Sequence, residues 1–443
     1  MGPDASLAPL TASDLYRFKW VSDVQLSLDG RRVAYVVTAP EELGKKNRSE
    51  IWVVETAPCA AGHLKGLPAG KRFTGGPRDR LPRWSPDGKL LAFVSDRGGE
   101  NQIWLIPSDG GEANQITRHF GGVGEPVWSP DGQAIAFVAS TGGDDRPLRP
   151  GGAAGDEKKS DVRAYTRLKY KANGKGLWDG KYAHVFVIPS AGGEPRQVTS
   201  GPYDDAGPAW SPDSQWLAFA SNRSDNPDHA PVSDIWVVPA AGGQPRALTR
   251  SEGQASGPAW SPEGHSIAFY GHRNQFRGAT DTHIHVVPAD GTVEPADILQ
   301  GWDGSAGVSV GSDMMASSTP PPHWSEDGVW VYFLATERGA ADLYRARATA
   351  SDGEGQPPRP ERLTEDRHAL YSVSLGRGAG AFAAARATFT NPGDVYMYTP
   401  APGQAGYVGR RLTDLNPWLE QRAISEPEEM AYRGPDGDEV QGW

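Results

Sequence analysis

The sequence predicts an all-β protein, a seven-bladed β-propeller, on three observations. Its 443 residues include 55 Gly and 38 Pro, a turn-rich composition, yet 15 Trp, 14 Tyr and 12 Phe supply large apolar side chains for a core. A Trp-Ser-Pro-Asp-Gly phrase recurs along the chain. Two short apolar runs follow each copy, which is typical of a repeat whose unit is a small antiparallel sheet.

Five copies of the phrase mark five repeats. They are Trp84–Gly88, Trp128–Gly132, Trp210–Ser214, Trp260–Gly264 and Trp324–Gly328. The first apolar runs are Leu90–Val94, Ile135–Val138, Trp216–Phe219, Ile267–Tyr270 and Val329–Phe333, and the second are Ile103–Ile106, Val185–Ile188, Ile235–Val238, Ile284–Val287 and Leu343–Tyr344. β-Branched and aromatic residues dominate these runs, which therefore predict strands. An apolar residue followed by Thr, as in Ile116-Thr117, closes most repeats.

Two weaker copies bring the number of repeats to seven. One starts at Leu26 and closes at Thr74, and the other starts at Val373 and closes at Thr413. Most spacings are near the roughly 40–50 residues of a four-stranded blade. The third repeat is longer and predicts an insertion at about residues 141–181. The propeller is thereby expected over residues 21–414.

The repeated phrase is interpreted as scaffold. Pro presets φ at the second position of a tight turn, Asp hydrogen-bonds its own backbone, and Gly tolerates the conformation that follows. The recurring Trp is expected to pack between blades.

Blade topology predicts which end of the disc carries the rest of the chain. If the strands of a blade are named a to d in chain order, the b–c loops and the d-to-a crossovers lie at one end. Residues 1–20 and 415–443 must then emerge beside the b–c loops. The N-terminal segment predicts a short helix over residues 9–20, capped by Thr11 or Ser13, with Leu15, Phe18 and Trp20 as its apolar stripe. The C-terminal segment predicts a hairpin, with strands at Glu428–Arg433 and Glu439–Trp443, that begins a further sheet.

Basic residues gather on the predicted b–c loops. The stretch Asp156–Lys175 of the insertion holds seven Lys/Arg and three Asp/Glu on a chain whose net charge is −11. Its basic and aromatic side chains, with two arginines of blade five, are the candidate substrate-gating residues: Arg163, Arg167, Lys169, Tyr170, Lys171, Arg273 and Arg277. A solvated loop is the alternative.

An arginine also follows strand b in four blades, at Arg97, Arg223, Arg273 and Arg338. Two interpretations stay open for these four residues. They either pair with acidic residues of adjacent blades or form a basic rim that attracts a carboxylate or carbonyl-rich ligand.

The repeats and both tails resemble known proteins. The Trp-Ser-Pro-Asp-Gly phrases resemble the TolB-type propeller repeat, and the whole chain resembles the non-catalytic half of a prolyl oligopeptidase family serine peptidase. Segments Arg167–Gly176, Tyr182–Val187, Leu10–Leu15 and Asp414–Trp418, with Asp436-Gly437, resemble the acylaminoacyl-peptidase branch. The resemblance implies an α/β-hydrolase domain after Trp443 with a Ser-Asp-His triad and an oxyanion hole, capped by the propeller. It implies peptide substrates and an exopeptidase or oligopeptidase activity, with dipeptidyl- or carboxypeptidase-type specificity as an alternative.

No catalytic motif of that family is expected in these residues. Gly307–Gly311 matches a nucleophile elbow in form, but an elbow needs a strand before it and a helix after it, so Ser309 is not expected to be catalytic. His283 and His285 share a strand face, yet no third ligand has convincing spacing, so no metal and no cofactor are expected. The competing class is a TolB-like binding propeller without enzymatic activity.

Composition and charge limit the cellular location and the classes of partner expected for the protein. The acidic charge argues against nucleic acid, and no apolar run is long enough for a membrane span. The start of the chain does not read as a signal peptide, and a single cysteine, Cys59, allows no intrachain disulfide. A cytoplasmic protein is therefore expected, and a homo-oligomer is left open.

Overall fold

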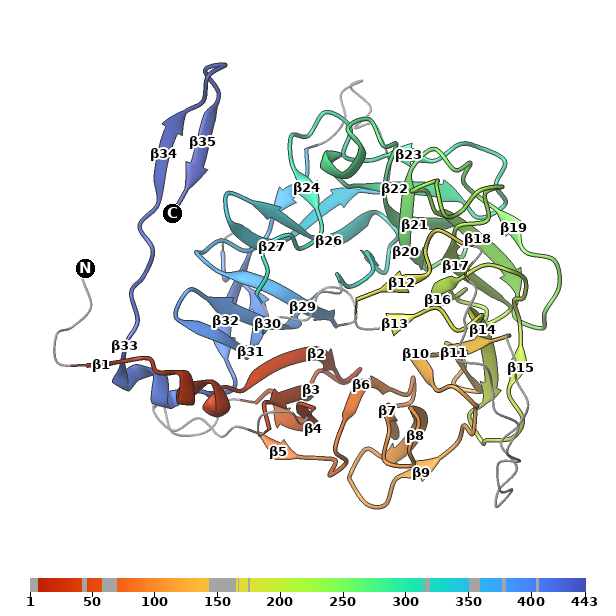
Figure 1. The fold of residues 1–443 in the computed structure, drawn as a ribbon, viewed down its shortest axis with the longest axis horizontal. Coiled ribbons are helices and arrows are strands. Elements are labelled where there is room, and N and C mark those ends of the chain that lie inside the picture. The colour runs from red at the N-terminus through yellow and green to blue at the C-terminus, as the bar shows by residue number, and fades with distance from the viewer. Residues whose placement is uncertain are drawn as a thin grey trace.

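The computed structural model describes residues 7–41, 46–57, 70–142, 165, 167–173, 176–312, 314, 319–349, 359–376, 380–403 and 406–443. Arg163 and Cys59 lie outside these ranges. The strands form seven blades arranged as a ring (Figure 1). A single parallel pairing of Ala341 with Ala369 joins blades six and seven into one sheet. The all-β, seven-bladed prediction is confirmed.

The first four blades each use four antiparallel strands in chain order. Blade one has β2 (Trp20–Leu26), β3 (Arg32–Ala39), β4 (Arg48–Glu55) and β5 (Lys71–Arg72). Blade two has β6 (Asp79–Trp84), β7 (Leu90–Ser95), β8 (Gln102–Pro107) and β9 (Asn114–Gln115). Blade three has β10 (Val123–Trp128), β11 (Ala134–Thr141), β14 (Tyr182–Pro189) and β15 (Arg196–Gln197), and blade four has β16 (Asp205–Trp210), β17 (Trp216–Ser221), β18 (Asp234–Pro239) and β19 (Arg246–Ala247).

The last three blades repeat the pattern with one variation. Blade five has β20 (Gln254–Trp260), β21 (Ser266–His272), β22 (His283–Pro288) and β23 (Ala296–Asp297). In blade six strand a is divided into β24 (Ser305–Ala306) and β25 (His323–Trp324), followed by β26 (Trp330–Glu337), β27 (Ala340–Arg347) and β28 (Glu361–Arg362). Blade seven has β29 (Ala369–Leu375), β30 (Phe382–Thr388), β31 (Asn391–Pro400) and β32 (Tyr407–Arg411).

The ring closes without a shared strand, because blades one and seven are each built from consecutive segments. Side chains of blade seven instead bind the backbone of β2. The Tyr371 hydroxyl donates to the Val21 carbonyl at 2.9 Å, and the Ser372 and Ser374 hydroxyls accept from the backbone N–H groups of Val24 and Leu26. Closure therefore depends on these hydrogen bonds and on the apolar packing between the two blades.

In blades two to six the recurring Trp packs between its blade and the one before it, as predicted. Its ring is largely buried, and its indole N–H donates to a strand-a carbonyl of the preceding blade at 2.9–3.2 Å. The pairs are Trp84 to Gln25, Trp128 to Arg83, Trp210 to Val127, Trp260 to Ala209 and Trp324 to Ala259. A side chain that is both apolar and a donor satisfies the inner strand while it fills the space between blades.

The Ser-Pro-Asp-Gly phrase forms the a–b turn in the predicted way. In blade two the Asp87 carboxylate accepts from the Ser85 hydroxyl at 2.6 Å and from the Lys89 N–H at 3.1 Å, and Gly88 has φ of +71°. The Ser85 hydrogen bond, followed by the backbone one, holds the pKa of Asp87 below its usual range. These residues are therefore scaffold.

A second repeated device, the c–d clasp, joins strand c to strand d. A polar side chain lies within the first four residues of strand c in each blade, at Glu50, Gln102, His184, Asp234, His283, Asp342 and Asp394. In six blades the closing Thr accepts a hydrogen bond from the backbone N–H of the next strand-c residue, and these are Thr74, Thr117, Thr199, Thr249, Thr364 and Thr413. Blade five has Leu299 where the others have Thr, and its His283 binds Asp297 at 2.8 Å instead.

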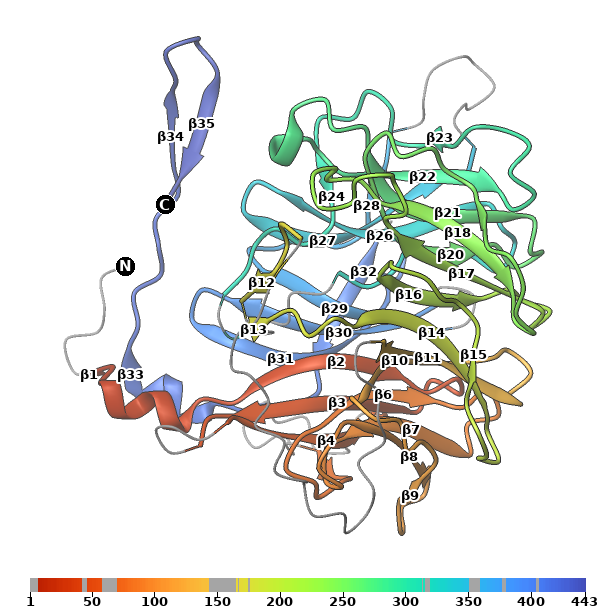
Figure 2. The ribbon, with the colours of Figure 1, turned by 45° about the vertical axis from the view of Figure 1, so that its right-hand side comes forward.

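The two tails bind each other beside blade one. β1 (Ala8–Pro9) pairs in parallel with β33 (Arg422–Ala423), and the short 3₁₀ helices η1 (Ala12–Arg17) and η4 (Pro417–Gln421) lie between these strands and the ring. The Asp14 carboxylate pairs with the Arg422 guanidinium, with Oδ1 and Nη2 3.0 Å apart. Phe18 packs edge-on against Trp418, with ring centroids 5.0 Å apart. Beyond β33 the chain extends to a hairpin, β34 (Met430–Arg433) and β35 (Glu439–Gly442), which projects from the ring in Figures 1 and 2.

The prediction of a helix over residues 9–20 is wrong in extent and in its buried face. Only Ala12–Arg17 is helical, because β1 ends at Pro9 and β2 begins at Trp20. Thr11 is the N-cap, but the buried residue is Asp14, whereas Leu15 is exposed. Ion pairs and hydrogen bonds to Asp14 therefore replace the expected apolar stripe on this segment. Within the described ranges, no helix is long and apolar enough to cross a membrane.

Candidate functional site on the b–c face

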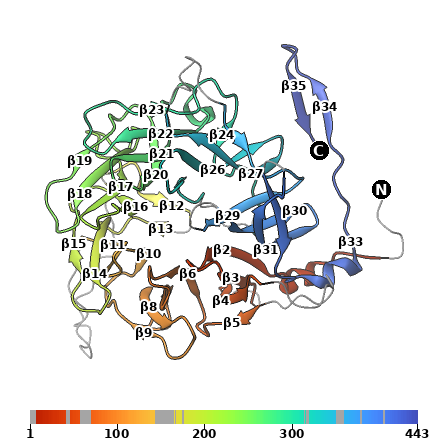
Figure 3. The same ribbon diagram turned by 180° about the vertical axis from the view of Figure 1, so that it is seen from behind.

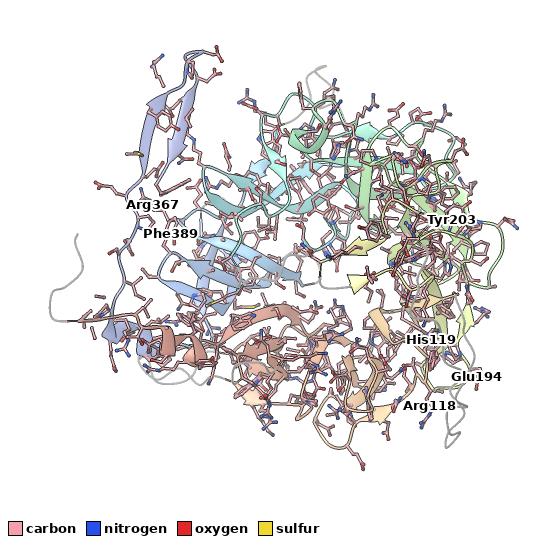
Figure 4. All side chains as sticks on the ribbon, viewed as in Figure 1. Arg118, His119, Glu194, Tyr203, Arg367 and Phe389 are labelled. Atoms are coloured by element: carbon pink, nitrogen blue, oxygen red, sulfur yellow. The ribbon has the colours of Figure 1, made fainter. Side chains whose placement is uncertain are left out.

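The C-terminal hairpin lies on the b–c face of blades six and seven. Trp443 approaches Phe389 of the blade-seven b–c turn, with centroids 6.5 Å apart, and a Cβ on Gly339 of the blade-six turn would overlap its ring. Glu429 pairs with Arg367 of the blade six-to-seven crossover at 3.1 Å. Figure 4 shows Arg367 and Phe389 on the side of the ring nearest the hairpin. The topological prediction for this tail is confirmed.

The blade-three insertion carries a hairpin of its own, β12 (Lys171–Ala172) paired with β13 (Gly176–Leu177). It leaves the blade between β11 and β14, which is a b–c position. The views from the front and from behind both place it inside the outline of the ring (Figures 1 and 3). The β12–β13 hairpin of the insertion therefore lies over the central part of the propeller.

Arg167 fixes the insertion to the next blade. Its guanidinium binds Asp228 of the blade-four b–c loop at 2.7 Å and lies over the Trp178 ring, 4.8 Å from the centroid. The Asp228 hydrogen bond holds the pKa of Arg167 above its usual value, and the Arg167 hydrogen bond holds the pKa of Asp228 below its own. Both side chains are mostly covered. Arg167 thus positions the loop, a role that the charge count alone did not reveal.

The other described candidates of the insertion are exposed. The Lys169 ammonium donates to the Pro227 carbonyl at 2.7 Å, and Lys171 is exposed on β12. Tyr170 packs against Tyr165, with centroids 5.4 Å apart, and remains exposed. These groups present positive charge and aromatic surface on the same loop.

Blade five supplies Arg273 and Arg277. Arg277 stands at the start of the 3₁₀ turn η2 (Arg277–Ala279), has φ of +55° and is exposed. The Asn274 amide donates to the Pro231 carbonyl of the blade-four loop at 3.2 Å. The same blade-four loop binds Arg167 of the insertion through Asp228. The b–c loops of blades three, four and five therefore form one continuous surface.

Apolar side chains on this surface escaped the sequence-based prediction. Phe276 is 75% exposed, and Leu168 and Leu177 of the insertion are also exposed. The signal was present as an apolar residue inside a charged loop, but sequence alone does not tell an exposed loop residue from one that folds back onto the blade.

The recurring arginines behave in two ways. Of the two interpretations left open, pairing with an acid applies to Arg97 and Arg223, but the acid belongs to the same blade and not to an adjacent one. Arg97 binds Asp79 at 2.7 Å and Arg223 binds Asp205 at 2.8 Å, each within its own blade. The reason is register, because each acid begins strand a opposite the last residue of strand b. Arg223 also lies over Tyr203, which Figure 4 labels. Arg273 and Arg338 are exposed.

Ser309, His283 and His285, which the sequence also singled out, lie in three different surroundings. Ser309 lies in an irregular segment after β24, where its N–H donates to the Thr336 hydroxyl at 2.9 Å, and the described residues around it form no strand-turn-helix elbow. His283 is paired with Asp297, and His285 stacks on Phe269. Across the described ranges, no three His, Cys, Asp or Glu residues are arranged to hold a metal ion.

Comparisons with known proteins agree with this architecture. Residues 25–151 match the family model of the TolB beta propeller domain. The chain is 33% identical over 446 residues to the uncharacterized peptidase YuxL of Bacillus subtilis, with 98% of this chain and 63% of YuxL covered. Together these matches support the resemblance to a TolB-type propeller of a prolyl oligopeptidase family peptidase.

Solved structures show the same fold. The acylaminoacyl peptidase of Pyrococcus horikoshii matches with a TM-score of 0.67 at 19% identity, over 97% of this chain and 57% of that one. A puromycin-hydrolyzing peptidase of Mycobacterium tuberculosis matches with a TM-score of 0.60 at 17% identity, over the whole of this chain and 61% of that one. The chain thus spans about three fifths of the length of the relatives that it matches.

Proposed function

We propose that this propeller gates substrate access in a serine peptidase that acts on oligopeptides, an acylaminoacyl-peptidase-like exopeptidase or oligopeptidase. The observation that carries the proposal is the b–c face, where the C-terminal hairpin and the basic insertion of blade three occur together. The similarity to YuxL along nearly the whole chain supports a peptidase. The chain itself contributes selection of substrates, and the catalytic triad is supplied from outside these residues.

The partner is an α/β-hydrolase domain of the same polypeptide, docked on the b–c face. Exposed apolar side chains of the tails support this docking, because isolated patches of this kind mark interaction surfaces. They are Leu10, Leu15, Tyr16, Met430, Tyr432 and Trp443. We further propose a cytoplasmic protein and leave its assembly into oligomers open.

The reaction chamber is bordered by basic and aromatic residues of the b–c loops of blades three and five. Arg163, which lies outside the described residues, and Lys169, Tyr170, Lys171, Arg273 and Arg277 would meet the substrate, while Arg167 positions the insertion through Asp228. Positive charge on an acidic protein favours peptides that enter with a free carboxylate.

Two measurements test the function. A fluorophosphonate probe should label a serine of the full-length polypeptide but nothing in the 443-residue chain, and Ser309→Ala is the matched control, which should change neither result. The full-length polypeptide should hydrolyse short peptides and discriminate against folded proteins. Labelling of Ser309, or the absence of any peptidase activity in a labelled full-length polypeptide, would contradict the proposal.

The gating residues are tested separately. Lys169→Ala, Lys171→Ala and Arg277→Ala should lower kcat/KM for peptides with a free C-terminus more than for their C-terminal amides. Arg167→Ala should impair both substrates together, because it releases the whole insertion. Equal, small effects of all four substitutions on both substrates would reduce this surface to a solvated loop.

A further inference from the structure

Blades two and four surround their strand-b arginine with the same three partners. The guanidinium of Arg97 binds the fully buried Asp79, its Nε donates to the Ser95 hydroxyl at 3.0 Å, and the group lies over the Trp104 ring, 4.9 Å from the centroid. Blade two therefore holds the cation with an acid, a hydroxyl and an indole.

Blade four repeats this arrangement. Arg223 binds Asp205, its Nε donates to the Ser221 hydroxyl at 3.2 Å, and it lies over the Trp236 ring at 4.9 Å. The Arg223 side chain is only 9% exposed.

Blade five keeps the arginine and replaces all three partners. Strand register pairs Ala255 with Gly271, as it pairs Asp205 with Ser221 in blade four, and His285 occupies the strand-c position of Trp236. Each replacement removes charge or volume beside Arg273. The Arg273 side chain is accordingly 60% exposed, and it pairs with the equally exposed Glu252 at 3.4 Å.

A pocket occupies the resulting space between blades four and five. Its volume is about 50 Å³, which is room for a few atoms, and Ala255, Phe269, Gly271, Arg273 and His285 are among its lining residues. His285 is 7% exposed, and its Nδ1 has no hydrogen-bond partner among the described residues. An unpaired ring nitrogen of this kind is a candidate ligand contact, because buried polar atoms are normally bonded.

The acidic residues around the pocket are already bonded. The Asp234 carboxylate accepts from the Thr249 hydroxyl at 2.5 Å and from the Ser251 N–H at 2.6 Å. Glu294 pairs with Arg250 at 2.9 Å. Glu252 remains, and an exposed pair such as Glu252 with Arg273 contributes little to stability, so a competing anion can displace it.

We propose that this pocket binds a carboxylate group, which takes the place that the Asp carboxylate holds in blades two and four. Arg273 receives one carboxylate oxygen, and Nδ1–H of His285 donates to the other. The ligand is the terminal carboxylate of a peptide. Only that choice of ligand rests on the proposed function, because the pocket itself is independent of catalysis.

Binding to the 443-residue chain tests the proposal without any turnover. Calorimetry would compare acetate, an N-acetyl dipeptide with a free C-terminus and the C-terminal amide of the same dipeptide. The free dipeptide should bind at least tenfold more tightly than the amide and shift the His285 ring resonance. Acetate binding as tightly as the dipeptide would support the pocket and name small carboxylates as its ligands. Equal binding of acid and amide would overturn it.

Matched variants assign the binding to this pocket. Arg273→Gln should abolish it, whereas Arg250→Gln, at the rim of the same pocket, should leave it unchanged. Glu252→Gln should strengthen it, because a competitor for Arg273 is removed. Ala255→Asp should restore the internal pair of blades two and four and eliminate ligand binding in a protein that stays folded by circular dichroism. Undiminished binding to Arg273→Gln or to Ala255→Asp would refute the site, and peptidase activity with no carboxylate binding would refute it without touching the proposed function.

Discussion

Blades four and five share their fold, their Ser-Pro phrase and an arginine after strand b, yet they use that arginine differently. Arg223 of blade four is buried against Asp205, and Arg273 of blade five is open to solvent above Ala255. The strand pairing is the same in both. The comparison shows that a repeat can preserve its backbone while a few side chains convert a structural ion pair into an available cation.

The difference lies in the strand-a acid. Burial raises the pKa of Asp205, but hydrogen bonds from His184, Thr199 and Arg223 outweigh it and hold the pKa below its usual value. A carboxylate in this environment needs its cation. In blade five the acid is missing, so the cation is not needed for folding.

The largest expected effect is a difference in stability between two arginine substitutions. Arg223→Ala should lower the free energy of unfolding by about 3–5 kcal/mol, because it leaves Asp205 buried without its cation. Arg273→Ala should cost about 0–1 kcal/mol, as for an exposed pair. Urea unfolding of both variants measures this. Equal losses would show that Arg273 is structural and would remove the contrast between the blades.

A smaller loss of stability, the same in both blades, is expected when the recurring tryptophan of blade four or of blade five is replaced. Trp210→Phe and Trp260→Phe each remove one indole hydrogen bond to the preceding blade, at 3.1 Å in both cases. Each should cost about 1 kcal/mol. Unfolding midpoints compare the two. A much smaller cost for Trp260→Phe would mean that blade five is loosely packed throughout, and that the exposure of Arg273 is not specific to its site.

A larger ring in the blade-five pocket should raise the free energy of unfolding slightly, whereas the substitutions above lower it. His285→Trp restores the ring that blades two and four place beneath their arginines, and a cation–π contact at a partly exposed site contributes about 0.5–1 kcal/mol. Unfolding should therefore shift to slightly higher urea concentrations. The matched control is His272→Trp, which alters the pocket rim without restoring the strand-c ring and should give no gain.

Sequence predicted the fold well because the repeats are local. Each Trp-Ser-Pro-Asp-Gly turn and each strand depends on neighbouring residues, and seven copies average out errors in any one of them. The partners of charged residues were harder. The pairing of Arg97 with Asp79 depends on strand register, which residue spacing alone does not define. The contact of Arg167 with Asp228 joins two loops whose relative position residue spacing does not define either. The blade-five pocket could not be predicted from sequence, because the strand register is needed to show that Ala255 stands where blade four has Asp205.

The smallest expected effect concerns pH and the c–d clasps of the two blades. Blade four uses Thr249 and Asp234, whereas blade five uses His283 and Asp297. The hydrogen bond to Asp297 raises the pKa of His283 above its usual value, so protonated His283 stabilises the folded state. This contribution is complete below the unfolded-state pKa of about 6.5 and is lost as pH rises through the raised folded-state value.

Unfolding measured between pH 5.5 and 8.5 should therefore show a stability term that His283→Gln removes and that Thr249→Val leaves in place. The hydroxyl of Thr249 does not titrate in this range, so the blade-four variant changes stability by the same amount at every pH. A pH dependence that persists in His283→Gln would assign the proton to another histidine. In that case the two clasps would differ in composition but not in their response to pH.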